Sequence, residues 1–541
     1  MPNFLNRLCW TFALLPAAAF AQTQKFASHF PLDSTNVPAA VRAIADGKPW
    51  LGKERGPVEG LMVFAQEKSG AVWLGGDQGA ACFDRKASHP WDRWQYFHGR
   101  RWLPDNSVQN IHVAKTPAAG RQVWIRTKMG VSLIEWRPMT LEQKARMFDE
   151  RIEARHVRHG MVADSHLRVP GDVASSVQND NDNDGLWTAI HLGAQAYRFA
   201  VTRDPDAQAK AQRSVRLLMR LEEITGIPGF PARSFVSKDE PKPHGGEWHP
   251  TADGQWLWKG DTSSDELVGH YFGYALYFDL VADEAEKKPI RQVVSRLTDH
   301  LIRHDYDLID LDGQPTRWGQ WSERYYQTEE GKYEAPLRSL ELLAFLKTAH
   351  HITGDAKYEA AYQDRIKRGY AEHTRRYRRW PGGGEINFSD DELAYLSYDP
   401  LLRYEKDPKL RRIYLDSLRF TWKQIRPDRN PLWNYISVAG GAGRLWRNIR
   451  NESFRALERI PTDMIEWTVQ NSHRTDVKLV PDKDRFGRSQ LANALPPDER
   501  AVAKWNSNPY RPDGGNGGAG EDDGAYFLLP YWMGRYHGWV E

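Results

Sequence analysis

Acidic residues and a histidine stand together near the middle of the chain. Asp265 and Glu266 are followed, one helical turn later, by His270. Residues four apart share one flank of a helix, so Glu266 and His270 are expected side by side. A histidine can act as a general base near neutral pH. The alternative is a buried histidine that makes only hydrogen bonds within the core.

A second segment, residues 312–326, is rich in arginine, tryptophan and tyrosine. Its candidate side chains are Arg317, Trp318, Trp321, Tyr325 and Tyr326. Arginine forms paired hydrogen bonds with a carboxylate, and tyrosine can donate or abstract a proton. Tryptophan offers a flat apolar face on which a sugar ring can stack. These residue types predict a loop that binds a saccharide, with plain loop packing as the alternative.

Further candidates stand at expected helix starts and in late connections. They are Asn183, Trp187, Asp390, Asp391, His473 and Arg474. An acidic residue at a helix start can be a simple N-cap, so that interpretation stands beside substrate contact. For His473 and Arg474, substrate contact and loop packing both remain open.

The run Asp180, Asp182, Asp184 and Gly185 resembles the start of a calcium-binding loop. The bidentate glutamate of an EF-hand would fall on His191, which excludes that motif. A looser calcium site on the three aspartates remains an alternative to helix capping and substrate contact. Otherwise we expect no cofactor.

The elements that must position these residues are helical from about residue 140 onward. Four segments repeat one plan: a helix, a short turn with an aspartate, and a second helix. The turn aspartates, placed to cap the second helices, are Asp204, Asp283, Asp355 and Asp407. The first helices are expected to start at 183–185, 263–266, 338–341 and 389–392, with a fifth start at 521–524.

Consecutive helix hairpins with long return connections predict a mainly α fold, an α/α toroid that forms an incomplete barrel of αα-hairpins. The first helices would line the centre, with their N-terminal ends open on one face. Asp184, Asp265, Glu341 and Asp391 should then lie at the same end. Free N–H groups at helix starts attract anions, so this mouth is the expected site.

The region between Leu61 and Trp136 has a β pattern. Segments 72–79 and 123–130 repeat a strand and a glycine-containing turn, and a short apolar strand follows each. This predicts two β-hairpins that resemble the blade repeat of propellers in two-component regulators. Two copies cannot close a propeller, which takes about four to eight blades. We therefore expect a small β module at 22–139, packed on a catalytic toroid at 140–541.

The first 21 residues read as a secretory signal peptide. Arg7 precedes an apolar run from Leu8 to Phe20, and small residues stand at Ala19 and Ala21. The run is too short to span a bilayer, so we expect a periplasmic or secreted protein. A formal net charge of +3 gives no reason to expect a nucleic-acid or membrane partner. The 22 tryptophans and 22 tyrosines tilt the expectation toward a carbohydrate partner.

With asparagine, histidine, arginine and tyrosine around its mouth, region 140–541 resembles the bacterial α/α-barrel polysaccharide lyases of the alginate and glucuronan type. The resemblance implies β-elimination on a uronic-acid polysaccharide or oligosaccharide. By the same resemblance, Asn183 or Arg317 would neutralise the carboxylate and His270 would remove the proton. Tyr325 or Tyr326 would protonate the leaving oxygen.

Two other functions fit the same residues. An inverting glycoside hydrolase would use Asp265 or Glu266 together with Asp390 or Asp391. Such carboxyl pairs lie about 6.5–9.5 Å apart. The third alternative is a periplasmic carbohydrate-binding protein, suggested by the propeller-like repeat.

Overall fold

Strands begin where the expected signal peptide ends. The computed structural model describes residues 22–50, 52, 55–114, 120–241, 245–378, 387–504 and 506–541. The expected signal peptide, 1–21, lies outside the described residues. β1 (Thr23–Phe30) pairs antiparallel along its whole length with β9 (Val131–Pro138), so the segment after the expected cleavage position belongs to a sheet.

Two antiparallel sheets make up the β module. One has the strand order β1-β9-β8-β7 and the other β2-β3-β4-β5-β6. The other strands are β2 (Lys48–Pro49), β3 (Leu61–Gln66), β4 (Val72–Gly76), β5 (Gly79–Phe83), β6 (Trp94–Phe97), β7 (Val108–Val113) and β8 (Arg121–Thr127). The repeated segments form the hairpins β4-β5 and β8-β9, one in each sheet. Trp73 and Ile125 belong to one apolar cluster shared by both sheets, because alternate side chains face inward.

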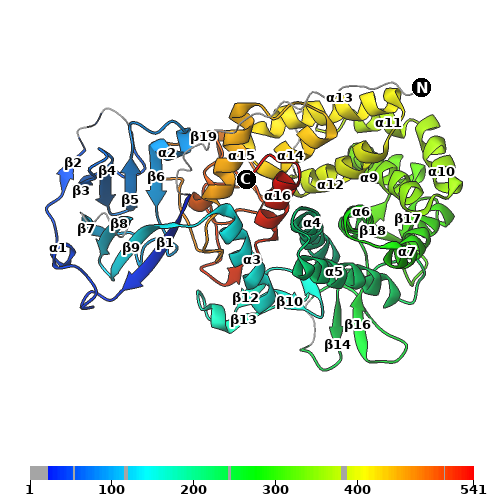
Figure 1. The fold of residues 1–541 in the computed structure, drawn as a ribbon, viewed down its shortest axis with the longest axis horizontal. Helices are drawn as coiled ribbons and strands as arrows, with labels where there is room; N and C mark the ends of the chain where they lie inside the picture. The colour runs from blue at the N-terminus through cyan, green and yellow to red at the C-terminus, as the bar shows by residue number, and fades with distance from the viewer. Residues whose placement is uncertain are drawn as a thin grey trace, which may run out of the picture.

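Most of the helices lie together, away from these two sheets (Figure 1). The main ones are α3 (Leu141–Arg155), α4 (Asp184–Thr202), α5 (Pro205–Glu223), α6 (Ser264–Leu280), α7 (Glu284–Arg303), α8 (Glu323–Tyr326), α9 (Glu329–Thr353), α10 (Ala356–Lys367), α11 (Tyr370–Thr374), α12 (Phe388–Tyr404), α13 (Pro408–Ile425), α14 (Pro431–Gly440), α15 (Arg447–Arg459) and α16 (Ala525–Tyr536). The four turn aspartates are the N-caps of α5, α7, α10 and α13, and each accepts a main-chain N–H. Helices α16, α4, α6, α9, α12 and α14 contact one another in that order, and α14 contacts α16 again.

The prediction of a mainly α toroid with a small β module is wrong. The structure is 45% helix and 18% strand, and its described residues contain seven sheets, one of them five-stranded. It is a mixed α/β fold with a β module. The connections between helix pairs are not plain loops but short sheets, for example β17 (Asp307–Ile309) with β18 (Pro315–Gln320). Strands of three to six residues leave too little periodicity in the sequence to be seen.

Small sheets also hold the other connections together. They comprise β10 (Val157–Arg158), β11 (Met161–Val162), β12 (Ser165–Leu167), β13 (Ser176–Val177), β14 (Phe235–Ser237), β15 (Trp248–Pro250), β16 (Trp256–Lys259), β19 (Leu479–Lys483), β20 (Ser489–Leu491) and β21 (Gly520–Glu521). β21 pairs with β12, which ties the segment before α16 to the segment before α4. The short helices α1 (Ala39–Arg42) and α2 (Pro90–Arg93) lie in the β module.

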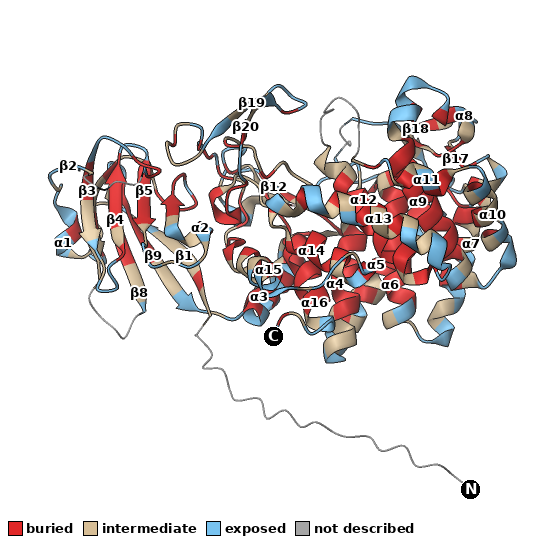
Figure 2. Ribbon diagram, turned by 90° about the horizontal axis from the view of Figure 1, so that it is seen from above, coloured by how far each residue is buried: buried red, intermediate tan, exposed pale blue. Residues whose placement is uncertain are grey.

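The main core lies between the helices, as the buried residues in Figure 2 show. α6 is buried on nearly all sides from Ser264 to Phe278. A helix that is apolar all round must lie inside the molecule, which explains its place between α4 and α9. Within the described part of the chain, no helix combines the length and apolar character needed to cross a membrane.

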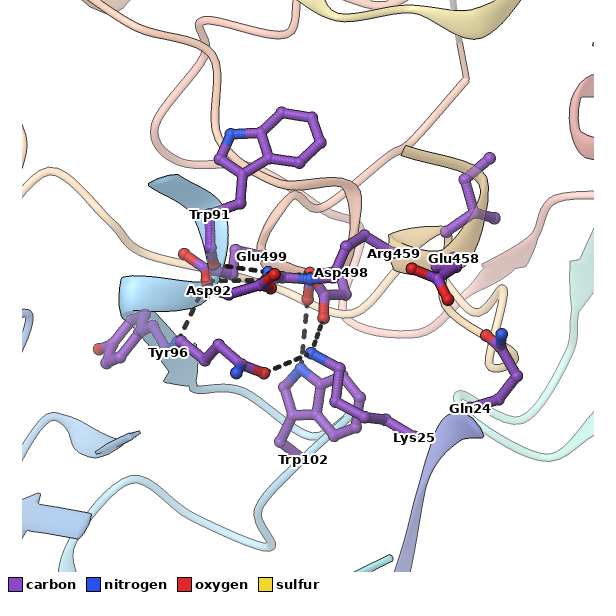
Figure 3. Close-up of polar contacts among 12 residues, drawn as sticks. Gln24, Lys25, Trp91, Asp92, Tyr96, Trp102, Glu458, Arg459, Asp498 and Glu499 are labelled. Atoms are coloured by element: carbon purple, nitrogen blue, oxygen red, sulfur yellow. Dashed lines mark hydrogen bonds and ion pairs between the residues drawn. The ribbon is translucent and has the colours of Figure 1, made fainter. Parts of the chain in front are cut away.

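The β module is joined to the helices through buried ion pairs (Figure 3). Lys25 from β1 pairs with Asp498, which also pairs with Arg459 at the end of α15. Arg459 pairs in addition with Glu499, at 3.2 Å. All four side chains are at most 11% exposed. Charges removed from water are tolerated only when paired, so this contact fixes the two parts against each other.

Candidate functional site

A cavity of about 830 Å³ opens at the N-terminal ends of α6, α9 and α12. We call it the mouth cavity. Its lining includes Asp265, Trp318, Glu334, Arg338, Arg376, Arg378, Asp390, Asp391, Gln424 and Arg485. A second cavity of about 480 Å³ shares Asn387, Ser389 and Arg485 with it, so the hollow extends as a groove. Residues far apart in the sequence therefore converge here.

Asp390 is the most unusual acid of the mouth cavity. It stands in the first turn of α12, half-buried, and its carboxyl accepts a hydrogen bond of 2.7 Å from the Asn387 amide. Burial raises the pKa of Asp390 to about 8, helped by the nearby carboxylates of Asp391 and Glu334 and opposed by Arg338. A carboxyl group with such a pKa keeps its proton at neutral pH and can act as a general acid.

Asp391, the next residue, is held in a different way. Its carboxylate forms an ion pair with Arg378 and accepts a hydrogen bond of 2.8 Å from the Tyr377 hydroxyl. It is only 1% exposed. These contacts engage both of its oxygens, so we assign Asp391 to positioning Arg378 rather than to proton transfer.

Arg338 organises the α9 side of the mouth cavity. Its guanidinium contacts Glu334 at 2.9 Å and Glu341 at 3.3 Å. Glu341 is fully buried, and burial raises its pKa to about 7. The sequence analysis expected Glu341 at a helix start; α9 begins at Glu329 instead, so Glu341 lies within the helix. The expected start at 338–341 is therefore wrong, whereas Asp184, Asp265 and Asp391 do stand in the first turns of their helices.

Asp265 reaches the mouth cavity from the first turn of α6. Its carboxylate accepts a hydrogen bond of 3.3 Å from the Asn183 amide, which joins the starts of α4 and α6. The Asn183 side-chain oxygen in turn accepts from Arg233 and Ser263. Asn183 thus supports the wall of the cavity, although it is not itself part of the lining.

The arginine- and tyrosine-rich segment reaches the mouth cavity only in part. Trp318 lines it, and the exposed Arg317 guanidinium lies 4.3 Å from the Trp318 ring centroid. Tyr325 is 8% exposed and donates a hydrogen bond of 3.0 Å to Glu334. Burial and the Glu334 charge raise the pKa of the Tyr325 hydroxyl above its usual value. Tyr326 is buried against Ser339 and Tyr370, behind the wall.

Trp321 does not offer the stacking surface expected of it. Its side chain is 0% exposed, and its indole N–H donates to Glu341 at 2.8 Å. The sequence places Trp318 and Trp321 only three residues apart, but β18 ends between them and the chain turns inward. Trp321 is part of the core, and only Trp318 remains a candidate for contact with a substrate.

His270 and Glu266 lie beneath the mouth cavity rather than in it. Both are 0% exposed. The His270 ring nitrogens lie 2.6 Å and 3.2 Å from the carbonyl oxygens of Glu266 and Leu218. Burial lowers the pKa of His270 to about 4 and raises that of Glu266 well above its usual value. The contacts of His270 match the alternative of a core histidine and give no access to a substrate.

The three aspartates of the calcium-like run have cationic partners from the protein itself. Asp182 contacts the Lys259 ammonium at 2.6 Å, and Asp180 lies 3.7 Å from the same group. Asp184 is buried against Arg158 and Ser234. Across the described residues, no three acidic, histidine or cysteine side chains are arranged to hold a metal ion. The run therefore gives no geometric support for a calcium site.

The remaining sequence candidates lie outside the mouth cavity. His473 contacts Tyr96 of the β module at 3.1 Å, and Arg474 pairs with Glu499 at 2.7 Å. Both therefore belong to the contact between the β module and the helices. Trp187 is half-buried on α4, with the Lys504 ammonium 4.3 Å from its ring centroid.

Sequence reasoning missed several residues of the mouth cavity. Glu334 was not considered because the start of α9 was placed too late, and Arg338, which stood in the expected start at 338–341, was not chosen as a candidate. Thr328, which caps α9 and is followed by two glutamates, was the available signal. Arg376, Arg378 and Arg485 come from turns whose place in the fold has no signature in the sequence.

Comparisons with known proteins add little to this geometry. No protein-family model matches the chain. No curated protein matches it either. A solved structure described as the crystal structure of a sugar epimerase from a ruminal bacterium is similar over 72% of this chain and 97% of that chain. The identity is 8% and the TM-score is 0.38, a likeness too distant to support an argument about function.

Proposed function

We propose that this protein is a carbohydrate-active enzyme that hydrolyses glycosidic bonds in an acidic saccharide. The observation that carries the proposal is Asp390, a carboxyl group that lines a large cavity and whose pKa burial raises to about 8. Glycoside hydrolysis needs one protonated carboxyl as acid and one ionised carboxylate as base. The mouth cavity brings carboxyl groups from different helices into one space.

Asp265 is the best-placed partner for Asp390. It lines the same cavity from a different helix, and a hydrogen bond from the Asn183 amide orients it. Glu334 is a weaker choice because Arg338 and Tyr325 already hold the same Glu334 oxygen. In the reaction, Asp390 protonates the glycosidic oxygen while Asp265 takes a proton from water. The water oxygen then bonds to the anomeric carbon as its bond to the leaving oxygen breaks.

The arginines of the mouth cavity support an acidic substrate. Arg338 and Arg378 are already paired with carboxylates of the protein. Among the described residues, Arg376 and Arg485 have no acidic side chain within ion-pair distance, and both line the cavity. An arginine that faces a cavity can bind a carboxylate through two parallel hydrogen bonds. A uronic-acid residue supplies such a group.

The test is the activity of two variants on a panel of uronic-acid and neutral polysaccharides. Asp390→Asn and Asp265→Asn should each lower turnover by about 10²–10⁴-fold, the usual contribution of one acid or base. Reducing ends measure cleavage. Asp239→Asn, at an exposed position that does not line the mouth cavity, is the control and should keep full activity. Full activity in both cavity variants would refute the assignment.

β-Elimination, the reaction of the polysaccharide lyases that the sequence resembles, is the second candidate. The observation that favours it is Tyr325, whose hydroxyl contacts Glu334 at the wall of a cavity that contains free arginines. Because burial raises the pKa of Tyr325, its hydroxyl keeps its proton at neutral pH and can donate it to the leaving oxygen. Product identity separates the two reactions. An unsaturated uronate, detected by its ultraviolet absorbance, would indicate elimination, whereas a saturated end carrying oxygen from labelled water would indicate hydrolysis.

A further inference from the structure

A basic surface lies outside the mouth cavity, on α13 and on the connection between α14 and α15. Between Lys409 and Arg455 the chain carries 11 lysines and arginines but only 3 acidic residues. The whole chain has a formal net charge of +3, so this one segment is far more basic than the rest of the molecule. A local excess of positive charge attracts anions over several ångströms.

This surface contains a hollow of about 200 Å³, which we call the basic hollow. It is lined by Arg419, Trp422, Lys423, Arg426, Arg444 and Trp446, and uncharged residues complete the lining. Trp446 is 61% exposed, which is rare for so large an apolar side chain. Trp422 is half-buried, and its indole N–H donates to Asn434 at 2.9 Å, so its ring is fixed in place.

Not all of the positive charge in the basic hollow is neutralised by the protein. Arg426 pairs with Glu452 at 2.5 Å, and Arg419 lies 3.4 Å from Asp416. Lys423 and Arg444 are exposed, and within the described parts of the chain no acidic side chain comes within ion-pair distance of either. These two cations are free to meet an anionic ligand.

The basic hollow is a neighbour of the mouth cavity. Lys423 lines the hollow, while the next residue, Gln424, lines the mouth cavity. Both stand in the last turn of α13, and the Gln424 amide donates to the Arg378 carbonyl oxygen at 3.3 Å. Only the end of one helix therefore separates the two spaces.

We propose that the basic hollow is a subsite for an anionic polysaccharide chain whose other part occupies the mouth cavity. This inference rests on the proposed function. The hollow joins a ring surface on Trp446 to free cations on Lys423 and Arg444, and a uronic-acid unit presents the matching apolar face and carboxylate. A concave hollow of this size can hold a sugar ring, whereas a flat membrane surface would not fit into it.

The experiment measures binding separately from cleavage. The probes are fluorescein-labelled polygalacturonate, labelled neutral dextran, and vesicles that contain phosphatidylglycerol. The variants are Lys423→Ala with Arg444→Ala, and Trp446→Ala alone. Arg85→Ala with Lys128→Ala removes two exposed cations from the β module and serves as the matched control. Fluorescence anisotropy in low and moderate salt gives each Kd.

We expect both hollow variants to bind polygalacturonate about threefold to tenfold more weakly than the control. The Kd of the double variant should depend less on salt concentration, because two ion pairs that salt would screen are lost. Dextran should bind weakly to all of them. Unchanged polygalacturonate binding in both hollow variants would overturn the inference. So would vesicle binding that depends on the hollow while polygalacturonate binding does not, since that result assigns the surface to a membrane.

The outcome can be separated from that of the proposed function. Asp390→Asn should lose cleavage but keep the dependence of polygalacturonate binding on the basic hollow, because the hollow itself is intact. Cleavage without any dependence of binding on the hollow would reject the inference and leave the proposed function standing. Binding that depends on the hollow, with no cleavage of any polysaccharide, would reject the proposed function and confirm the subsite.

Discussion

At the scale of single residues, one carboxyl group connects the chemistry of the mouth cavity to the stability of the protein. An exposed aspartate has a pKa of 3.8, whereas burial raises the pKa of Asp390 to about 8 in the folded chain. The folded state therefore holds its proton over a pH range in which the unfolded chain has lost it. Since the folded state binds more protons in that range, the free energy of unfolding falls as pH rises from about 4 to about 8.

Asp390→Asn should remove this cost because an amide cannot ionise. We expect the Tm of the variant to exceed that of the wild type near pH 8, and the difference to vanish below about pH 4, where the acid is protonated in both states. Thermal unfolding followed by circular dichroism across this range is the measurement. Asp239→Asn should show no such trend. A constant difference at every pH would show that burial does not raise the pKa of Asp390.

At the scale of elements, the sequence predicted helices and their caps better than it predicted the segments between them. Asp283 shows why, because a capping aspartate before an apolar periodic run is a local signal, and the structure has it as an N-cap in a capping box. The two β-hairpins were also predicted correctly, since each repeats a strand, a turn and a strand.

The short sheets could not be predicted in the same way. β17 and β18 pair across a connection that carries no alternating pattern, and in the fold β17 contacts α7 while β18 contacts α6. His270 shows that site residues are equally hard to place from the sequence. Its spacing from Glu266 fits a pair on the surface and a pair in the core equally well. Only the packing of α6 on all sides decides that it is buried.

The segment from β18 to α8 gives a prediction at this scale. Trp321→Ala should lower the free energy of unfolding by about 3–5 kcal/mol, because a fully buried tryptophan leaves a cavity and Glu341 loses its donor. Trp318→Ala should change stability by less than about 1 kcal/mol, because Trp318 is only half-buried and faces the mouth cavity, but should weaken saccharide binding. Urea unfolding and a binding titration on both variants provide the comparison. Equal stability of the two variants would contradict the buried position of Trp321.

At the scale of the whole molecule, the β module and the helices are joined by ion pairs that are largely buried. Arg459 contacts Asp498, Glu499 and the Trp91 carbonyl oxygen, and is 3% exposed. The pKa of Asp498 lies well below its usual value, because the charges of Arg459 and Lys25 outweigh the effect of burial. This stabilisation is present above the unfolded pKa and is lost as pH falls through the folded one.

Arg459→Met should therefore destabilise the protein far more than the loss of an ordinary ion pair. It leaves two buried carboxylates with fewer partners, and breaking a buried pair on one side costs about 3–5 kcal/mol. Arg455→Met is the matched control, because Arg455 lies one turn earlier on α15 and pairs with Asp92 at 2.5 Å, but is 31% exposed. That change should cost less than about 1 kcal/mol. Tryptophan fluorescence and far-ultraviolet circular dichroism during urea unfolding measure the stability of both variants.

Because the network lies between the two parts of the molecule, the unfolding transitions seen by fluorescence and by circular dichroism should no longer coincide in the Arg459 variant. The β module should separate before the helices unfold. Equal destabilisation by the two variants, with coincident transitions in both, would show that the ion pairs of Arg459 do not hold the parts together.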